Sequence, residues 1–119
     1  MKDSTFEFMR SSIAAERRAL DVLYETMDEN EFLKTLDYIL KSNLTVLSAC
    51  GSSGFAAKKF AHSLCCVECP AKFVPPSEAV HGGMGALKKD NLLILVSKGG
   101  KTDELVPLVS IAKAKGAKI

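Results

Sequence analysis

The sequence has no apolar run close to the roughly 20 residues that a membrane-spanning helix needs. Its first residues are charged and lack the apolar core of a secretion signal. Blocks of like charge are also missing, and 16 basic against 14 acidic residues leave a net charge of only +2. A chain without a basic surface is not expected to bind nucleic acid or an anionic bilayer. We therefore expect a cytoplasmic protein with neither partner, although this charge is compatible with a small anionic ligand.

Histidine is scarce, with two residues, and the four cysteines of this intracellular-looking chain indicate free thiols rather than disulfides. His62, Cys65, Cys66 and Cys69 fall near the end of one predicted helix, and Cys66 and Cys69 have the spacing of half a zinc site. No second pair completes this site, and helical spacing places Cys65 on the apolar face. We expect buried thiols, no metal and no cofactor, with a zinc or redox protein as an alternative. Cys50, in a glycine turn, is a candidate reactive thiol.

Apolar residues at spacings of three and four predict two helices within residues 1–43. The first has a narrow, heptad-like seam from Phe6 to Met27, in which Glu16 fills one polar slot. Such a seam suits packing on a helix of a second subunit, or equally an ordinary core-facing role. The second helix is expected to be capped by Asn30 and to end at Ser42.

From residue 44 the pattern changes to short apolar runs that alternate with helical segments. Strands are expected over residues 44–49, 71–74 and 92–96, and the last is apolar enough to be covered on both faces. A final helix includes residues 105–112, where Pro107 should weaken the start and Gly116 should end it, before Lys118 opens another strand. The alternation predicts a three-layer α/β/α sandwich with a parallel sheet over residues 44–119, preceded by the helical segment 1–43.

Two turns rich in glycine and hydroxyl residues, 51–54 and 97–102, each follow a predicted strand. The carboxyl ends of parallel strands meet at one edge of the sheet, where ligands bind. Backbone N–H groups, hydroxyls and a following helix N-terminus together favour a phosphate group. Neither turn has the spacing of a dinucleotide or P-loop motif, which makes a nucleotide the weaker prediction. Small residues also occur in such connections for purely geometric reasons, so a turn without a ligand is the alternative.

Three segments, 49–54, 76–82 and 97–105, resemble in order and spacing the SIS (sugar isomerase) domain family, and in particular its arabinose-5-phosphate isomerase branch. The resemblance implies a flavodoxin-like, Rossmannoid sandwich, a sugar phosphate as ligand, and interconversion of an aldose and a ketose phosphate as the activity. A sheet of that family has five strands, and this sequence stops as its fourth begins. We therefore expect a domain truncated at its C-terminus, with an open sheet edge.

The resemblance also assigns roles to individual residues. It implies that the phosphate is held by the turn after the third strand, with two serines of the first turn on the other side: Ser97, Gly99, Gly100 and Thr102, then Ser52 and Ser53. It places a carboxylate base at Glu104 and an active-site or metal-contacting histidine at His81. Isomerisation needs a proton to be removed beside a carbonyl and returned to the next carbon, which suits a positioned carboxylate and a histidine that titrates near neutrality. Without the resemblance, an acid in the first turn of a helix and an ordinary loop histidine are the competing interpretations.

Two departures from the family pattern affect the functional prediction. Ser52 stands where the isomerase branch typically has lysine, and Gly99 stands where the phosphate turn has a second serine. Lys98 and Lys101 could restore positive charge there, although turn lysines are more often solvated. A non-catalytic, regulatory phosphosugar-binding module is therefore kept as an alternative to the isomerase. The modest core of a chain of this size and the open sheet edge predict self-association as a homodimer or homotetramer.

Overall fold

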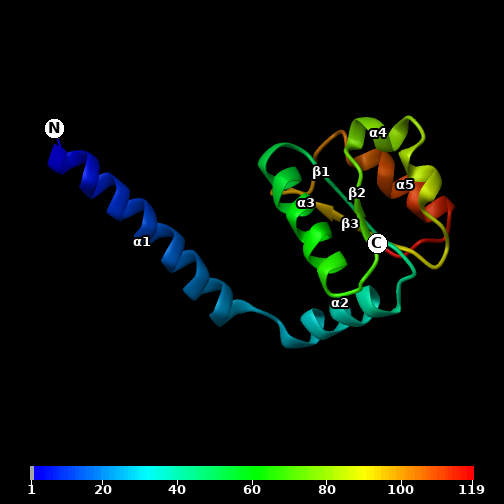
Figure 1. Cartoon of the computed structure of the whole chain (residues 1–119), viewed down its shortest axis with the longest axis horizontal. Coiled ribbons are helices and arrows are strands. Elements are labelled where there is room, and N and C mark those ends of the chain that lie inside the picture. The colour runs from blue at the N-terminus through cyan, green and yellow to red at the C-terminus, as the bar shows by residue number, and fades with distance from the viewer. Residues whose placement is uncertain (1) are drawn as a thin grey trace. The chain divides into compact units, whose positions relative to one another are not determined.

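The computed structural model describes residues 2–119, with side chains from residue 4 onward. The chain divides into two compact units, Met1–Lys34 and Thr35–Ile119, and each is described by itself. The elements in chain order are α1 (Lys2–Thr26), α2 (Glu29–Lys41), β1 (Thr45–Ala49), α3 (Gly51–Cys66), β2 (Ala71–Phe73), α4 (Pro76–Val80), the 3₁₀ helix η1 (Gly83–Ala86), β3 (Leu92–Val96) and α5 (Val106–Ala114) (Figure 1). Within residues 2–119, no helix is long and apolar enough to cross a membrane.

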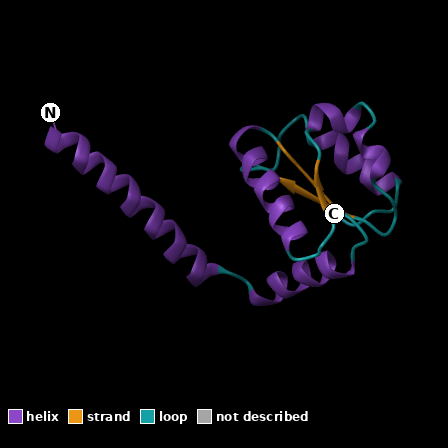
Figure 2. Ribbon diagram, viewed as in Figure 1, coloured by secondary structure: helices purple, strands orange, loops and turns teal. Residues whose placement is uncertain are grey.

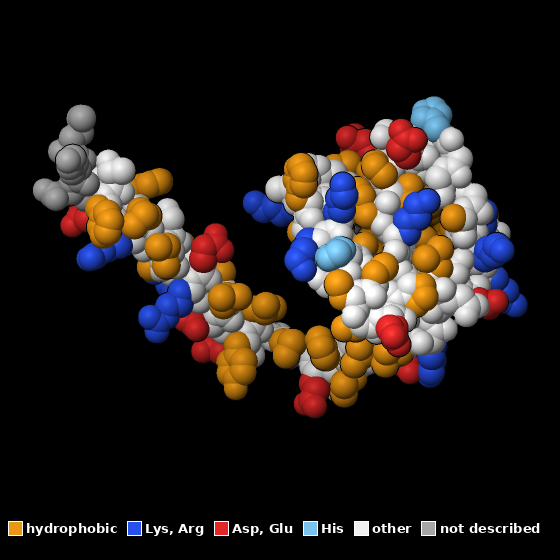
Figure 3. Space-filling model, in the orientation of Figure 1, with side chains coloured by type: hydrophobic (Ala, Val, Ile, Leu, Met, Phe, Trp, Pro, Cys, Tyr) orange, Lys and Arg blue, Asp and Glu red, His pale blue; other side chains and the backbone are white. Residues whose placement is uncertain are grey.

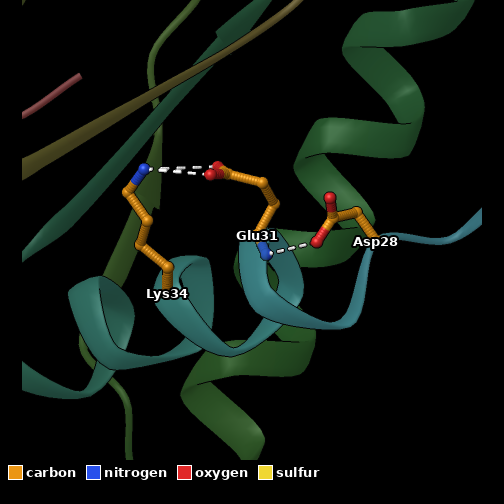
Figure 4. A network of polar contacts seen from close by, with 3 residues as sticks. All are labelled: Asp28, Glu31 and Lys34. Atoms are coloured by element: carbon orange, nitrogen blue, oxygen red, sulfur yellow. Dashed lines mark hydrogen bonds and ion pairs between the residues drawn. The ribbon is translucent and has the colours of Figure 1, made fainter.

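The start of α2 differs from the sequence prediction. The backbone N–H of Glu31 donates to Asp28 Oδ1 at 3.0 Å, so Asp28 caps the helix, and Asn30 is its second residue (Figure 4). The prediction that Asn30 is the cap is therefore wrong. The Asp28 carboxylate both accepts an N–H that has no partner within the helix and lies at the positive end of the helix dipole. Glu31 in turn pairs with Lys34 Nζ at 3.1 Å on the exposed face.

The sheet is parallel, with strand order β2-β1-β3, and helices cover both of its faces (Figure 2). β1 pairs along its whole length with β3, from Thr45 with Leu92 to Ala49 with Val96. Beyond β3, Lys118 forms an isolated parallel bridge with Leu92, where the sequence predicts a further strand to open. The predicted three-layer α/β/α fold is confirmed.

Alternate residues of β1 supply the two halves of the core. Val46 faces a cluster with α4, η1 and α5, whereas Leu47 faces a cluster with α2 and α3. All five residues of the strand are buried, and the Ser48 hydroxyl donates to the Val74 carbonyl at 2.7 Å. This bond satisfies a polar group that would be costly to bury alone. It also ties the central strand to the loop after β2, which borders the candidate site.

Three local expectations are corrected by the structure. Pro107 lies in the first turn of α5, where a missing N–H costs no helical bond, so it does not weaken the helix. β3 is buried only at Leu92 and Leu93, while its last three residues are partly exposed. Cys65 and Cys66 are exposed and Cys69 is only partly buried, so the prediction of buried thiols is wrong. The buried stripe of α3 runs through Ala57, Ala61 and Leu64, which leaves Cys65 at its border.

Candidate functional site

Both predicted ligand turns begin at the same edge of the sheet. Ala49 and Val96 are paired at the carboxyl ends of β1 and β3, so the turns that follow start from neighbouring positions. β2 lies on the other side of β1, and the segment after β2, which includes α4, carries His81. Along this edge the order is therefore the β2 loop, the β1 turn and the β3 turn. The topology brings all three predicted segments to one edge.

The β3 turn is closed by its two hydroxyl side chains. Ser97 Oγ and Thr102 Oγ1 lie 2.8 Å apart, and the Gly100 N–H donates to Ser97 Oγ at 3.0 Å. Gly100 has a φ of +68°, a conformation that favours glycine. Gly99, also exposed, has open space where a side chain would begin. Because glycines form the tip of the turn, its backbone is accessible to an approaching anion.

A small cavity of about 170 Å³ lies under this turn. Its polar wall comes from Ser97, Gly100 and Thr102. The rest is apolar, formed by Leu95, Leu105, Val106 and Val109. The hydroxyls therefore lie at the rim of an apolar hollow, which is an arrangement that excludes water from one side of a bound group.

The β1 turn is the N-terminus of the long helix α3. Cys50 is the N-cap residue without a side-chain cap, and the first intrahelical bond runs from the Gly54 N–H to the Cys50 carbonyl at 3.0 Å. The N–H groups of Gly51, Ser52 and Ser53 precede this bond, so they have no acceptor within the helix. Ser52 is exposed and Ser53 is partly buried. Three backbone donors and the positive end of the helix dipole therefore face this edge of the sheet.

A larger cavity of about 360 Å³ lies between the β1 turn and the β2 loop. It is lined by Ala49, Cys50, Gly51, Gly54, Phe55, Lys58, Phe73, Pro75 and Pro76. Ser52 and Ser53 are not part of this lining, whereas Phe55 and Lys58 were missed by sequence reasoning. Gly51, Gly54, Phe55 and Lys58 have spacings of three and four, which place them on one helix face, and this is the signal that could have revealed them.

Cys50 and Glu104 connect the two turns electrostatically. Partial burial, and secondly the negative charge of Glu104, raise the pKa of the Cys50 thiol. The carboxylate that the resemblance assigns as a base therefore lies within electrostatic range of the β1 turn. Glu104 belongs to the turn that precedes α5, whose first turn contains no acidic residue, so Glu104 is not an acid of that helix.

His81 ends α4 and is exposed. In residues 2–119, no hydrogen bond or ion pair joins His81 to Glu104 or to the two turns. The backbone after His81 is constrained at two glycines. Gly82 has a φ of +114°, which favours glycine, and a Cβ at Gly83 would come within 2.7 Å of Val74 Cγ1. His81 thus occupies a defined position at the end of α4, which packs against α5.

The cysteine cluster forms no metal centre in the described part of the chain, where no group of three or more potential ligands converges. Cys66 Sγ lies 3.6 Å from His62 Nε2, one helical turn earlier. Cys65 Sγ instead donates to the Ala71 carbonyl at 3.3 Å, and Cys69 is partly buried. The four residues of this cluster are close in sequence, but their side chains do not all converge on one point.

The model of the SIS domain family matches residues 38–119. Arabinose 5-phosphate isomerase KpsF of Escherichia coli is 33% identical over 112 residues, which are 93% of this chain and 34% of that protein. Arabinose 5-phosphate isomerase KdsD of Pseudomonas aeruginosa is 35% identical over 106 residues, 88% of this chain and 32% of the relative. The chain thus spans about a third of the length of these curated relatives.

Solved structures agree with this relationship. The crystal structure of a putative sugar-phosphate isomerase from Listeria monocytogenes superposes with a TM-score of 0.92 at 41% identity, over 98% of this chain and 62% of that one. The family model covers well over half of the chain and includes all three segments on which the resemblance was based. The chain therefore belongs to the SIS domain family.

Proposed function

We propose that this chain carries the phosphosugar site of an isomerase that interconverts an aldose phosphate and a ketose phosphate, with arabinose 5-phosphate as the expected substrate. The observation that carries the proposal is the hydroxyl-closed β3 turn, which starts beside the N-terminus of α3 at one sheet edge and is followed directly by Glu104. The names of the related proteins support the same reaction class.

In the proposed mechanism the β3 turn binds the phosphate through Ser97, Thr102 and the N–H groups around Gly99 and Gly100. The α3 N-terminus, with Ser52 and Ser53, supplies further donors from the other side. A phosphate held at this edge fixes the sugar carbons in place without taking part in the chemistry, which lowers the entropic part of the barrier.

Glu104 is the proposed general base. Its carboxylate removes the proton from the carbon next to the carbonyl and returns it to the neighbouring carbon through an enediol-like intermediate. His81 is the proposed group that transfers a proton between the sugar oxygens, because an imidazole can donate and accept near neutral pH. His81 follows β2 and α4 in the chain and Glu104 follows β3, and in the proposed complex a sugar lying across the β1 turn meets both.

The test compares binding and turnover in the same chain. Binding of arabinose 5-phosphate is measured by isothermal titration calorimetry, and formation of ribulose 5-phosphate is followed by NMR. We expect both in the unaltered chain. In Glu104→Gln we expect binding to persist while turnover falls by at least about a hundredfold, as for loss of a general base. Asp103→Asn, at the neighbouring acidic residue, is the matched control and should keep both.

A regulatory phosphosugar-binding module is the second candidate, favoured by the absence of any bond between His81 and Glu104 in the described residues and by Ser52 in the lysine position. Saturable binding without turnover in the unaltered chain would establish this candidate and exclude the isomerase for this chain. Turnover that survives Glu104→Gln would remove Glu104 as the base. Absence of both binding and turnover would overturn both functions.

A further inference from the structure

A thiol and an imidazole converge at the C-terminal end of α3, outside the candidate site. Cys66 Sγ lies 3.6 Å from His62 Nε2, one helical turn earlier. Both side chains are exposed, and neither lines the cavities beside the β1 and β3 turns. Thiolates and imidazoles are the ligands that Zn²⁺ prefers in proteins. The two residues therefore form a potential ligand pair at the end of α3 opposite to the proposed phosphate site.

The separation of the two ligand atoms fits a single metal ion. A Zn–S bond is about 2.3 Å long and a Zn–N bond about 2.0–2.1 Å, so tetrahedral geometry places the sulfur and the nitrogen roughly 3.5–3.6 Å apart. The observed separation is 3.6 Å, so Zn²⁺ would need no large rearrangement of either side chain. Residues four apart lie on one face of a helix, and two ligands at this spacing occur in helical zinc sites.

The end of α3 is favourable for a cation. Cys66 is the last residue of the helix, and the last turn contains no basic residue. The C-terminal end of a helix carries partial negative charge, which stabilises a nearby cation. Zn²⁺ bound to one thiolate and one neutral imidazole keeps a net positive charge, so this end of the helix stabilises the complex. Glu68 has a φ of +61° and ends the helical path directly after the pair, which leaves both ligand atoms accessible.

The other cysteines of the cluster have different surroundings. Cys65 Sγ donates to the Ala71 carbonyl at 3.3 Å, and Cys69 packs against the buried cluster between α3 and the sheet. In the part of the chain that the structure describes, no three potential ligands converge, so two protein ligands would leave the remaining positions of the metal to water. The chain has two histidines, and Figure 3 shows their side chains at separate places on the surface. The pair is therefore distinct from His81.

We propose that His62 and Cys66 form a two-ligand site for Zn²⁺ at the C-terminal end of α3. On binding, the Cys66 thiol loses its proton to solvent, and the thiolate and His62 Nε2 replace two water molecules of the hydrated ion. No electron is transferred, because Zn²⁺ has no redox chemistry under these conditions. The proposal goes beyond the isomerase function and does not depend on it.

The first experiment titrates the reduced, full chain with Co²⁺, which takes the place of Zn²⁺ and forms a charge-transfer band in the near ultraviolet when a thiolate binds it. We expect this band in the unaltered chain. Zn²⁺ is d¹⁰ and has no such band, so addition of Zn²⁺ should abolish the signal as it takes the same site. A chain that gives no cobalt–thiolate band would overturn the proposal.

Variants of the cluster identify the ligands. Cys66→Ser should abolish the band, and His62→Gln should weaken Co²⁺ binding at least about tenfold, since loss of even an outer-shell partner has an effect of this size. Cys65→Ser is the matched control, because this neighbouring exposed thiol bonds to a carbonyl instead, and it should leave the titration unchanged. Cys69→Ser should also leave it unchanged. If Cys69→Ser abolishes the band while His62→Gln keeps it, the site is the Cys-x-x-Cys pair and the proposal is wrong.

A rescue variant separates loss of a ligand from loss of structure. Cys66→His keeps two ligands one turn apart, so it should bind Zn²⁺ in calorimetry while giving no thiolate band. Circular dichroism verifies that each variant is folded. Absence of Zn²⁺ binding in a folded Cys66→His chain would contradict the chelating geometry of this helix face.

Protection from alkylation gives an independent readout. With Zn²⁺ at ten times its dissociation constant, roughly a tenth of the sites stay free, so iodoacetamide should modify Cys66 about tenfold more slowly. Fragmentation mass spectrometry distinguishes Cys66 from Cys65, whose rate should not change. Equal protection of both cysteines, or protection of Cys66 that persists in His62→Gln at the same Zn²⁺ concentration, would overturn the proposal.

Discussion

Ser97 Oγ and Thr102 Oγ1 lie 2.8 Å apart and close the turn that follows β3. Ser97 also accepts a hydrogen bond from the Gly100 N–H, so one hydroxyl fixes both the far end and the tip of the turn. One hydroxyl of the Ser97–Thr102 pair donates its single proton to the other, so the second hydroxyl keeps a proton that it can donate to a phosphate oxygen. The arrangement holds the donors in place before any ligand arrives, which lowers the entropic cost of binding.

Ser97→Ala removes both bonds and one donor. We expect the affinity for arabinose 5-phosphate, measured by calorimetry, to fall by about tenfold or more, which is the effect of one hydrogen bond to a charged group. Ser63→Ala is the control, because Ser63 bonds only within α3, to the Lys59 carbonyl and Lys59 Nζ. Equal affinity of Ser97→Ala and the unaltered chain would contradict the phosphate role of this turn.

The closeness of Glu104 and Cys50 predicts a pH effect. Iodoacetamide reacts with the thiolate, and a nearby carboxylate disfavours the thiolate, so Glu104→Gln should lower the pH at which Cys50 is half-maximally alkylated. The decrease should be partial, because burial is the larger cause of the raised pKa and remains in the variant. Mass spectrometry of the peptide containing Cys50 gives the readout, with Asp103→Asn expected to leave the midpoint unchanged.

Lys58 is predicted to contribute positive charge to the cavity beside the β1 turn, which it lines with Cys50 and Phe55. Lys58→Gln should weaken sugar-phosphate binding by several-fold, and the loss should shrink at high ionic strength, since salt screens an exposed charge. Lys59→Gln is a matched control one residue away, where the ammonium group donates to Ser63 Oγ at 2.7 Å. If the two variants bind equally well, Lys58 has no role in the site.

Gly83→Ala tests the tight backbone near His81. A methyl group there would lie 2.7 Å from Val74 Cγ1 and 2.8 Å from the Glu78 carbonyl oxygen, so we expect a loss of about 1–3 kcal/mol in the free energy of unfolding. Gly85→Ala, two residues later, has open space at its Cβ and should be neutral or slightly stabilising. Thermal unfolding followed by circular dichroism compares the two, and similar melting temperatures would contradict this close packing.

Hydrophobic periodicity was enough to predict α1, α2, α3, α5 and all three strands, because each carries apolar residues at the spacing of its own secondary structure. The short elements α4 and η1 were missed, since five and four residues are too few to show a period. Hydrophobic periodicity also could not decide whether Asp28 or Asn30 caps α2. Both residue types cap helices well, and the turn after α1 decides which of them precedes the first helical residue.

For a related reason, some residues of the candidate site could be predicted from the sequence and others could not. Strand ends locate turns, so Ser97 and Thr102 could be placed at this edge of the sheet from topology alone, whereas Glu104 was singled out by the family resemblance. Residues such as Phe55 and Lys58 reach the edge only through the orientation of α3, which depends on how that helix packs on the sheet. Cys65 was misplaced for the same reason, because the buried stripe of α3 ends at Leu64 rather than one residue later.

The central strand β1 has a kinetic consequence. Thr45 pairs with Ala71 on one side and with Leu92 on the other, so neither partner strand is local in sequence. Two long connections, the first of which contains α3, must close before β1 can form hydrogen bonds with its two neighbours. The conformational entropy lost in closing these connections must be paid before strand pairing lowers the free energy. Residues 35–119 are therefore expected to fold in roughly milliseconds to seconds rather than microseconds, with the search for the β1–β3 register as the slow step.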